Sequence, residues 1–165
     1  MTPIKECLIN KKTNLQPIWL MRQAGRYLPE FRKIRQENSN FINLCLNSNL
    51  SEEITLQPID RFDFDAAIIF SDILMIPYGL GQRVEFKKNF GPNLGDIFLD
   101  KLTENNEDIF TERLSPIYKL LQNLSKNNKL KNKDLIGFVG APWTLLVYMI
   151  NKASPKTGLS KNFFK

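Results

Sequence analysis

Histidine is absent from the 165 residues of this chain. Nucleophilic sites of the Ser-His-Asp or Cys-His type, and zinc sites that need imidazole ligands, therefore cannot be assembled from this chain alone. Any catalysis by its side chains has to depend on arginine, lysine, aspartate, glutamate or tyrosine, or on backbone groups.

Cysteine is scarce, and long apolar runs are missing. Cys7 and Cys45 are far apart and match no metal or disulfide spacing, so we expect reduced thiols, as in a cytoplasm. The longest apolar run, around Leu145 to Ile150, is far shorter than the ~20 residues of a membrane helix. The first residues also lack the charged and apolar segments of a secretory signal. We therefore expect a cytoplasmic protein with no membrane partner.

Basic residues exceed acidic ones, and this excess indicates the class of partner. The chain has 23 Lys and Arg against 17 Asp and Glu, in a composition whose 42% hydrophobic residues favour a packed domain. The net charge of +6 attracts anions, such as nucleic acid, phosphate, a membrane surface or a polycarboxylate. The clearest lysine cluster, over residues 126–133, lacks arginine and aromatic residues, so a solvated loop is favoured there and no nucleic-acid partner is expected.

Apolar runs and helical patterns alternate along the chain. Buried strands are predicted over residues 17–21, 65–70 and 135–140, each followed by a polar or glycine-containing loop and a helical pattern. This order predicts an α/β fold, either the opening of a (β/α) barrel or a doubly wound sheet. In both, functional groups follow the carboxyl ends of the strands, where Arg22 and Asp72 are placed.

The remaining elements are predicted from capping and turn residues. Helices are expected from Pro29, over 41–46, from a Ser51 cap to residue 62, over 108–124 with a kink at Pro116, and from Pro142 to residue 150. Residues 84–86 suit a short strand, and residues 89–95, rich in glycine and asparagine, suit a loop.

Four arginines fall within fourteen residues: Arg22, Arg26, Arg32 and Arg35. The planar guanidinium group binds carboxylate or phosphate through two hydrogen bonds, so the cluster predicts an acid-binding surface. The alternative is an exposed helix held by salt bridges, and the pattern alone leaves both open.

Asp72 and Tyr148 are the other candidates for a site. Asp72 follows the most hydrophobic predicted strand, where a carboxylate costs desolvation unless it is hydrogen-bonded, so it either caps a helix or serves a site. Tyr148 follows the third predicted strand, and its phenol is either part of the core or placed at a pocket.

Three strings of this sequence carry a family resemblance: PIWLMRQAGRYLPE at 17–30, AIIFSDIL at 67–74 and GAPWTLLVYM at 140–149. In content, order and spacing they closely resemble the uroporphyrinogen decarboxylase family. The resemblance implies a distorted (β/α)8 barrel of the TIM type, here an incomplete one with only the N-terminal portion. It also implies a homodimer at full length and a cofactor-free reaction, removal of the four acetate carboxyl groups of uroporphyrinogen III to give coproporphyrinogen III.

The same resemblance assigns roles residue by residue. The substrate-binding segment matches Arg22, Gln23, Ala24, Gly25 and Arg26, and a further carboxylate contact matches Arg35. The acid at the centre of the cleft matches Asp72, and a tyrosine at the substrate matches Tyr148. Among these, Asp72, Arg22 and Tyr148 are the predicted catalytic residues.

Chain length limits these expectations. A closed (β/α)8 barrel takes about 250 residues, so residues 1–165 are expected to form a truncated N-terminal part of one domain. The serine and late histidine that family members place at the substrate are not reached, and the isolated chain is predicted to be inactive. The alternatives are a related barrel methyltransferase that uses a corrinoid and zinc, and an anion-binding module without catalysis.

Overall fold

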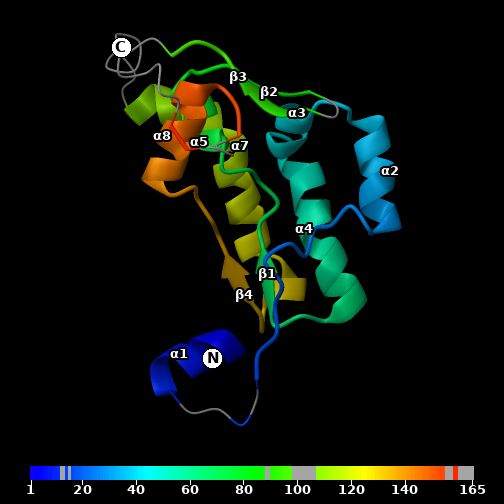
Figure 1. The fold of residues 1–165 in the computed structure, drawn as a ribbon. Helices are drawn as coiled ribbons and strands as arrows, with labels where there is room; N and C mark the ends of the chain where they lie inside the picture. Colours follow the sequence, from blue (N-terminus) through cyan, green and yellow to red (C-terminus); the bar gives the residue numbers. More distant parts are fainter. Residues whose placement is uncertain (12–13, 15, 88–89, 98–106, 155–157, 160–165) are drawn as a thin grey trace. The chain divides into compact units, whose positions relative to one another are not determined.

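A pair of parallel strands forms one of the two sheets of the described chain. The computed structural model describes residues 1–11, 14, 16–87, 90–97, 107–154 and 158–159 (Figure 1). In it β1 (Ala66–Ile68) pairs with β4 (Asp134–Ile136) in parallel, with Ala67 opposite Leu135. The strand predicted over residues 65–70 is therefore confirmed for Ala66–Ile68. The one predicted over 135–140 is formed only over its first residues and is half-buried, and Val139 is 67% exposed, so its predicted burial is wrong. The described chain is a mixed α/β structure.

The other described elements come before, between and after these two strands in the sequence. They are α1 (Pro3–Asn10), α2 (Pro29–Glu37), α3 (Phe41–Cys45), α4 (Ser48–Phe62), α5 (Met75–Gly79), β2 (Val84–Lys87), β3 (Gly91–Leu94), α7 (Glu107–Ser125), a 3-10 turn (Asn128–Leu130) and α8 (Pro142–Asn151). The predicted helices after Pro29 and Pro142 begin at those prolines, which suit the first turn because their missing N–H has no helical partner.

The chain divides into two compact units. Unit 1 contains the described residues of 1–39, 44–71 and 116–138, and unit 2 those of 40–43, 72–115 and 139–165. Helix α7 runs through the division, which falls at Pro116, the proline predicted to kink it. Each sheet has two strands in the described residues, so the predicted barrel portion is represented only by the β1–β4 pair.

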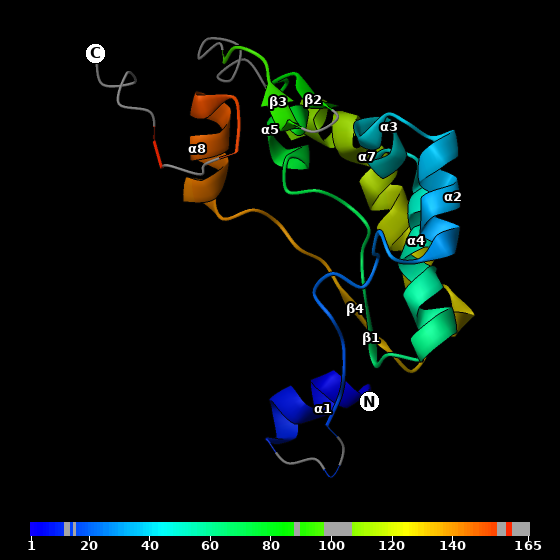
Figure 2. The same cartoon turned by 45° about the vertical axis from the view of Figure 1, so that its right-hand side comes forward.

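The core of unit 1 lies on one face of the parallel strands. Helix α4 and the C-terminal half of α7 lie on the same side of β1 and β4 (Figure 2). The buried residues of this cluster are Leu56, Ile59, Ala67, Ile69, Leu120, Leu124 and Leu130. Ala67 and Ile69 face the same way because side chains alternate along a strand, and this alternation fixes which side of β1 the helices cover.

The first of the three predicted strands in chain order, over residues 17–21, is not formed, so that prediction is wrong. Ile18 and Met21 are 58% and 74% exposed, and no strand is formed. Ile18 exchanges two hydrogen bonds with Asp65, donating its N–H to the carboxylate at 2.7 Å and accepting the Asp65 N–H at 3.0 Å. The ladder stops there, because the side-chain amide of Gln23 occupies the backbone positions that would continue it.

Helix α4 begins earlier than predicted. Asn47, not Ser51, caps it, since the Asn47 side chain accepts the N–H of Leu50 at 3.1 Å. Ser51 is fully buried inside the helix and donates its hydroxyl to Leu44 O at 3.0 Å. Both residue types are good caps, and the sequence gives no way to see that Ser51 is needed at the end of α3.

Unit 2 contains a hairpin whose first strand, predicted over residues 84–86, is confirmed, while its second strand was not predicted. Strands β2 and β3 pair antiparallel, with Val84 opposite Leu94, so the loop expected over residues 89–95 is wrong for 91–94, while residue 89 lies outside the described residues. Gly91 has φ 81°, which favours glycine, and the missing N–H of a proline in β3 is tolerated at the edge of a two-stranded sheet. Gln82 joins the hairpin to α8 by donating to the backbone oxygens of Gly95 and Met149 at 2.8 and 3.1 Å.

The lysine cluster is only partly the solvated loop that was predicted. Lys126 and Lys131 are exposed. Lys129 pairs with Asp60 at 2.7 Å, and Lys133 pairs with Asp63 at 2.7 Å. The Lys133 ammonium lowers the pKa of the Asp63 carboxyl through a hydrogen bond and its charge. These pairs join the segment before β4 to the end of α4.

Among the helices of the described ranges, α7 is the longest, at 19 residues. None of these helices combines the length and the apolar character that crossing a membrane requires.

Thr55 links α4 to the end of β1 and provides a test of this packing. Its buried hydroxyl donates to Ser51 O at 2.7 Å and accepts the N–H of Phe70 at 2.9 Å. We expect Thr55→Val, which leaves the Phe70 N–H without an acceptor, to lower the free energy of unfolding by about 1–3 kcal/mol. The exposed Thr111→Val in α7 should change it by less than about 0.5 kcal/mol in the same denaturant titrations. Equal effects of the two substitutions would show that the Thr55 hydroxyl does not link α4 to the end of β1.

Candidate functional site

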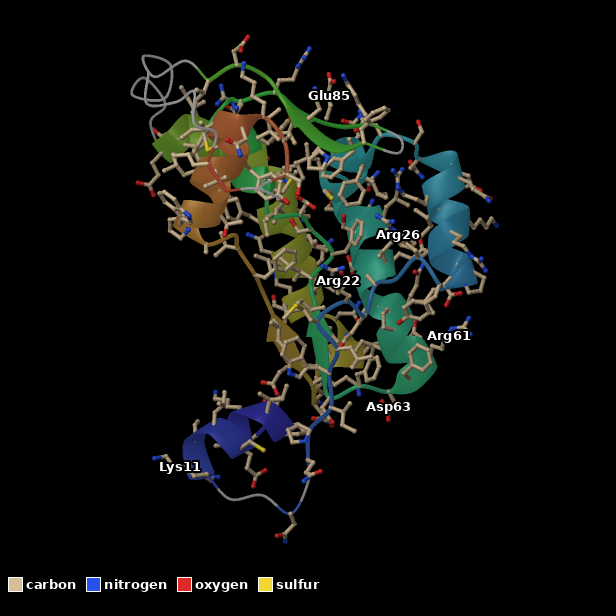
Figure 3. All side chains as sticks on the ribbon, viewed as in Figure 1. Lys11, Arg22, Arg26, Arg61, Asp63 and Glu85 are labelled. Atoms are coloured by element: carbon tan, nitrogen blue, oxygen red, sulfur yellow. The ribbon has the colours of Figure 1, made fainter. Side chains whose placement is uncertain are left out.

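The arginine segment leads from the exposed residues 18–21 into α2. Arg22 and Arg26 are exposed and lie on this segment (Figure 3). Within the described part of the chain, neither guanidinium group forms an ion pair or a hydrogen bond. The alternative of a salt-bridged helix therefore does not apply to these two arginines, whose donors are available to an external acid.

The other predicted arginine has a different environment. Arg35 lies in the last turn of α2, is half-buried and donates to the backbone oxygens of Asn38 and Ser39, the second at 2.9 Å. This contact satisfies carbonyl groups just beyond the helix end, a common role for a basic residue there. The ion pair near α2 is instead Glu30 with Arg61 at 2.9 Å, which lowers the pKa of Glu30 through the Arg61 hydrogen bond. The carboxylate contact assigned to Arg35 stays a prediction.

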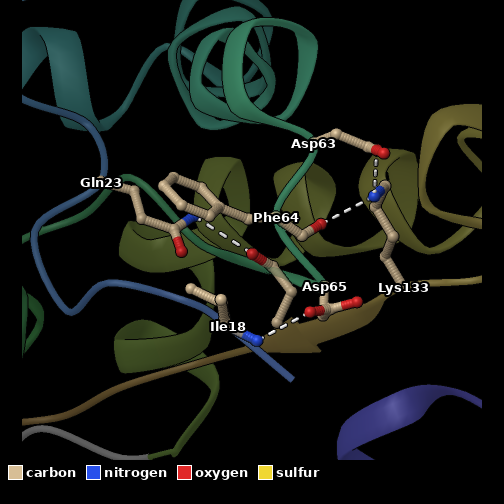
Figure 4. Close-up of polar contacts among 7 residues, drawn as sticks. Ile18, Gln23, Asp63, Phe64, Asp65 and Lys133 are labelled. Carbon is tan, nitrogen blue, oxygen red and sulfur yellow. Dashed lines mark hydrogen bonds and ion pairs between the residues drawn. The ribbon is translucent and has the colours of Figure 1, made fainter. Parts of the chain in front are cut away.

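Gln23 fixes the arginine segment to β1. Its side chain is 1% exposed, and its amide bridges two backbone groups. Oε1 accepts the N–H of Leu20 at 2.8 Å. Nε2 donates to Ala66 O at 3.1 Å, the bond drawn from Gln23 in Figure 4. Because both ends of this buried amide are hydrogen-bonded, the backbone at Gln23 is held more firmly than the backbone of a solvated loop. The sequence predicted Gln23 as a substrate contact; the structure gives its side chain an anchoring position between Arg22 and the strand.

Asp72 follows β1 by four residues and belongs to unit 2. Its Oδ1 accepts the N–H of Leu74 at 2.9 Å, and its backbone oxygen accepts the N–H of Met75 at 3.1 Å, so it stabilises the turn before α5. Burial raises the pKa of the Asp72 carboxyl, and the Leu74 N–H opposes this effect. The cap position of α5 is Leu74, and no side chain of the described residues caps that helix, so the capping alternative is wrong for Asp72. Its Oδ2 has no hydrogen-bond partner in the described residues.

Tyr148 and the loop before α8 lie in the same unit as Asp72. Tyr148 is half-buried on α8, and α8 contacts α5. Gly140 lies against Ile73, since a Cβ atom at Gly140 would be 3.1 Å from Ile73 Cβ and 2.6 Å from Leu145 Cδ2. The loops that follow β1 and β4 therefore meet next to Asp72, as expected for the carboxyl ends of neighbouring parallel strands.

The predicted site residues fall into two sets, each inside one unit. Arg22, Gln23, Ala24, Gly25, Arg26 and Arg35 belong to unit 1; Asp72 and Tyr148 belong to unit 2. Two residues that the sequence did not single out support the arginine segment: Asp65 bonds Ile18, and the Tyr27 hydroxyl donates to Gln23 O. Both contacts depend on how the backbone turns between residues 18 and 28, which residue types alone do not show. In the described part of the chain, no three His, Cys, Asp or Glu side chains are grouped as metal ligands.

Parallel strands joined through helices, with polar loops at their carboxyl ends, place the protein in the α/β class. Comparison with known proteins gives the family. The chain belongs to the uroporphyrinogen decarboxylase (URO-D) family, whose model matches residues 2–164.

Bacterial relatives support the same assignment. The chain is 48% identical over 134 residues to a uroporphyrinogen decarboxylase of a Chelativorans species, covering 81% of this chain and 39% of the relative. It is 44% identical over 156 residues to that of Rickettsia bellii, covering 94% and 46%. The chain thus spans less than half the length of these curated relatives.

The anchoring position of Gln23 can be tested through stability. Gln23→Ala removes the donor to Ala66 O, a carbonyl in a buried strand, and should lower the free energy of unfolding by about 1–3 kcal/mol. Gln36→Ala, an exposed substitution on α2, is the matched control and should change it by less than about 0.5 kcal/mol. Denaturant unfolding of both variants is the measurement, and a Gln23→Ala loss no larger than the control contradicts the anchor.

The raised pKa of Asp72 predicts a pH-dependent stability difference. Because the folded state binds the Asp72 proton more tightly than the unfolded state, stability falls as pH rises from the ordinary pKa near 3.8 through the higher folded value. Asp72→Asn keeps an acceptor for Leu74 N–H and removes this titration. We expect its free energy of unfolding, relative to the unsubstituted chain, to increase between about pH 3 and about pH 7. Glu112→Gln, an exposed charge removal, is the control, and an identical pH trend for both variants would show the pKa assignment to be wrong.

Proposed function

We propose that this chain provides the N-terminal part of a uroporphyrinogen decarboxylase, which removes the four acetate carboxyl groups of uroporphyrinogen III to give coproporphyrinogen III. The observation that carries this proposal is the pair of exposed guanidinium groups, Arg22 and Arg26, held on an anchored segment in a chain of this family. In the proposal the rest of a (β/α)8 barrel completes the site, because a closed barrel takes about 250 residues. A homodimer at full length and a cytoplasmic location belong to the same proposal.

The substrate's charge explains the basic segment. Uroporphyrinogen carries eight carboxylates, and a guanidinium group binds a carboxylate in a two-point, charge-assisted contact. The net charge of +6 also favours encounter with such a polyanion. Arg22 and Arg26 are assigned to binding and charge neutralisation, since a guanidinium group is too weak an acid to be a good proton donor near neutral pH.

The reaction needs an electron sink, and the substrate provides one. Protonation of a pyrrole ring carbon makes the ring cationic, so the electron pair of the bond to the carboxyl group can move into the ring as CO2 leaves. A second proton on the exocyclic carbon, with loss of the ring proton, completes the exchange: each acetate and one proton give a methyl group and CO2. No cofactor is required for this sequence.

Asp72 is assigned to the positive charge that develops in this step. Its carboxylate can accept pyrrole N–H groups through Oδ2, which is free of partners in the described residues, while Leu74 N–H holds Oδ1. A partly desolvated carboxylate stabilises a nearby cation more strongly than a solvated one does. The same desolvation raises its pKa, so activity that requires the ionised form should fall as pH is lowered. Tyr148, half-buried on α8, is assigned to contact with the substrate.

Reconstitution tests the proposal. The chain is co-expressed with the remaining part of the Rickettsia bellii relative, and coproporphyrinogen formation from uroporphyrinogen is followed. Arg22→Ala and Arg26→Ala should each lower kcat/KM roughly ten- to a hundredfold, as expected for the loss of a charge-assisted contact. Arg83→Ala, an exposed residue of the β2 region, is the control and should have little effect.

Two results would count against this function. Robust turnover by the isolated chain would contradict its assignment as one part of the site. Unchanged kcat/KM for both arginine variants in the reconstituted protein would remove the substrate-binding role of the segment, and zinc-dependent activity would instead favour the methyltransferase alternative.

A further inference from the structure

Tyr27 folds back over the segment that carries the two arginines. Its hydroxyl donates to Gln23 O at 2.9 Å. Its ring lies directly on Gly25, because a Cβ atom at Gly25 would be 2.0 Å from Tyr27 Cε1. The N–H of Leu28 donates to Gly25 O at 3.1 Å and closes the turn below the ring. Gly25 is therefore needed for close approach: any side chain there displaces the tyrosine.

The tyrosine bond spans the interval between the arginines. It joins Tyr27, the residue after Arg26, to Gln23, the residue after Arg22. Gln23 is itself fixed to β1 through Ala66 O. These two bonds restrict the distance between the backbone positions of Arg22 and Arg26, and they fix the segment to β1.

Tyr27 contributes little to the core, which is informative about its role. The residue is 53% exposed, so its ring covers less apolar surface than a core aromatic does. An exposed tyrosine placed on a glycine, with its hydroxyl on a backbone oxygen, restricts the turn more than it stabilises the domain.

We propose that Tyr27 is a positioning residue that sets the separation of the Arg22 and Arg26 side chains for two neighbouring carboxylates of one ligand. The inference rests on the proposed function, in which these arginines bind a polycarboxylate. Each pyrrole of a uroporphyrin carries two adjacent carboxylate arms, an acetate and a propionate, whereas each pyrrole of a coproporphyrin carries one. A fixed pair of guanidinium groups distinguishes these ligands because only the first offers two carboxylates at a short, constant spacing.

Binding of the two porphyrins to the reconstituted protein, the 165-residue chain co-expressed with the remaining part of the Rickettsia bellii relative, tests the role. Uroporphyrin III and coproporphyrin III are titrated, and affinity is followed by porphyrin fluorescence. Tyr27→Phe removes only the hydroxyl and should weaken uroporphyrin binding roughly three- to tenfold. This is the size of effect expected when one neutral hydrogen bond is lost and the turn that it restrained becomes more mobile. Coproporphyrin binding should change by less than about twofold, because a single carboxylate does not need the fixed spacing.

The matched control is Tyr118→Phe on α7, a similarly exposed tyrosine, which should leave both affinities unchanged. A general loss of stability would weaken the binding of both porphyrins equally. The selectivity ratio of the uroporphyrin affinity to the coproporphyrin affinity therefore separates positioning from a merely structural role.

A double-mutant cycle tests the contact with Gly25. Gly25→Ala displaces the ring, and Tyr27→Ala removes it, so each should reduce the uroporphyrin preference by a similar factor. Because both act through one contact, the combined variant should show no further reduction. Additive losses would overturn the shared role.

The outcomes separate this inference from the function on which it rests. If Arg22→Ala and Arg26→Ala weaken uroporphyrin binding but Tyr27→Phe leaves the selectivity ratio unchanged, the positioning role is wrong and the proposed function stands. If the unsubstituted reconstituted protein does not bind uroporphyrin, or its arginine variants bind it as well as the unsubstituted protein, the binding segment is wrong and the positioning role falls with it.

Discussion

The side-chain amide of Gln23 is the constraint on which the candidate site depends. The segment before Arg22 is exposed and forms no strand, so its backbone has few partners of its own. One buried amide takes the place of a strand ladder by bonding Leu20 on one side and Ala66 on the other. Losing it would leave a buried carbonyl unsatisfied, and this cost keeps the amide in place. Exposed arginines can then extend from a backbone that is itself fixed.

Strand β1 is fixed at both ends by side-chain hydrogen bonds within unit 1. The Gln23 amide bonds to its first residue, and Thr55 holds the N–H of Phe70 just after its end, two residues before Asp72. The two sets of site residues differ in their electrostatics. Arg22 and Arg26 remain exposed, where charge costs no desolvation, whereas burial raises the pKa of Asp72. An exposed cation attracts anions through solvent, whereas a partly buried carboxylate acts on charges close to it.

Much of the local structure could be predicted because it depends on short-range rules. The positions of β1 and β4 were recognisable as apolar runs, although β4 is shorter and less buried than its run predicts, and Pro29 and Pro142 marked helix starts. The family was predicted from three strings of the sequence, and the comparisons confirm that family.

Predictions failed where a distant or side-chain partner decided the outcome. The apolar run at residues 17–21 does not form a strand because a glutamine amide occupies its partner positions, and Ser51 does not cap α4 because the end of α3 uses its hydroxyl. Neither partner could be read from residue type or spacing.

Amide hydrogen exchange at two adjacent residues tests the central claim most directly. Leu20 and Trp19 both lie on the exposed segment, but only the N–H of Leu20 has a hydrogen-bond partner in the described residues, the Gln23 amide oxygen. Opening the anchor should be needed before Leu20 exchanges, so its rate, corrected for sequence, should be at least about tenfold slower than that of Trp19. Equal corrected rates for the two amides would show that Gln23 does not hold the arginine segment to β1.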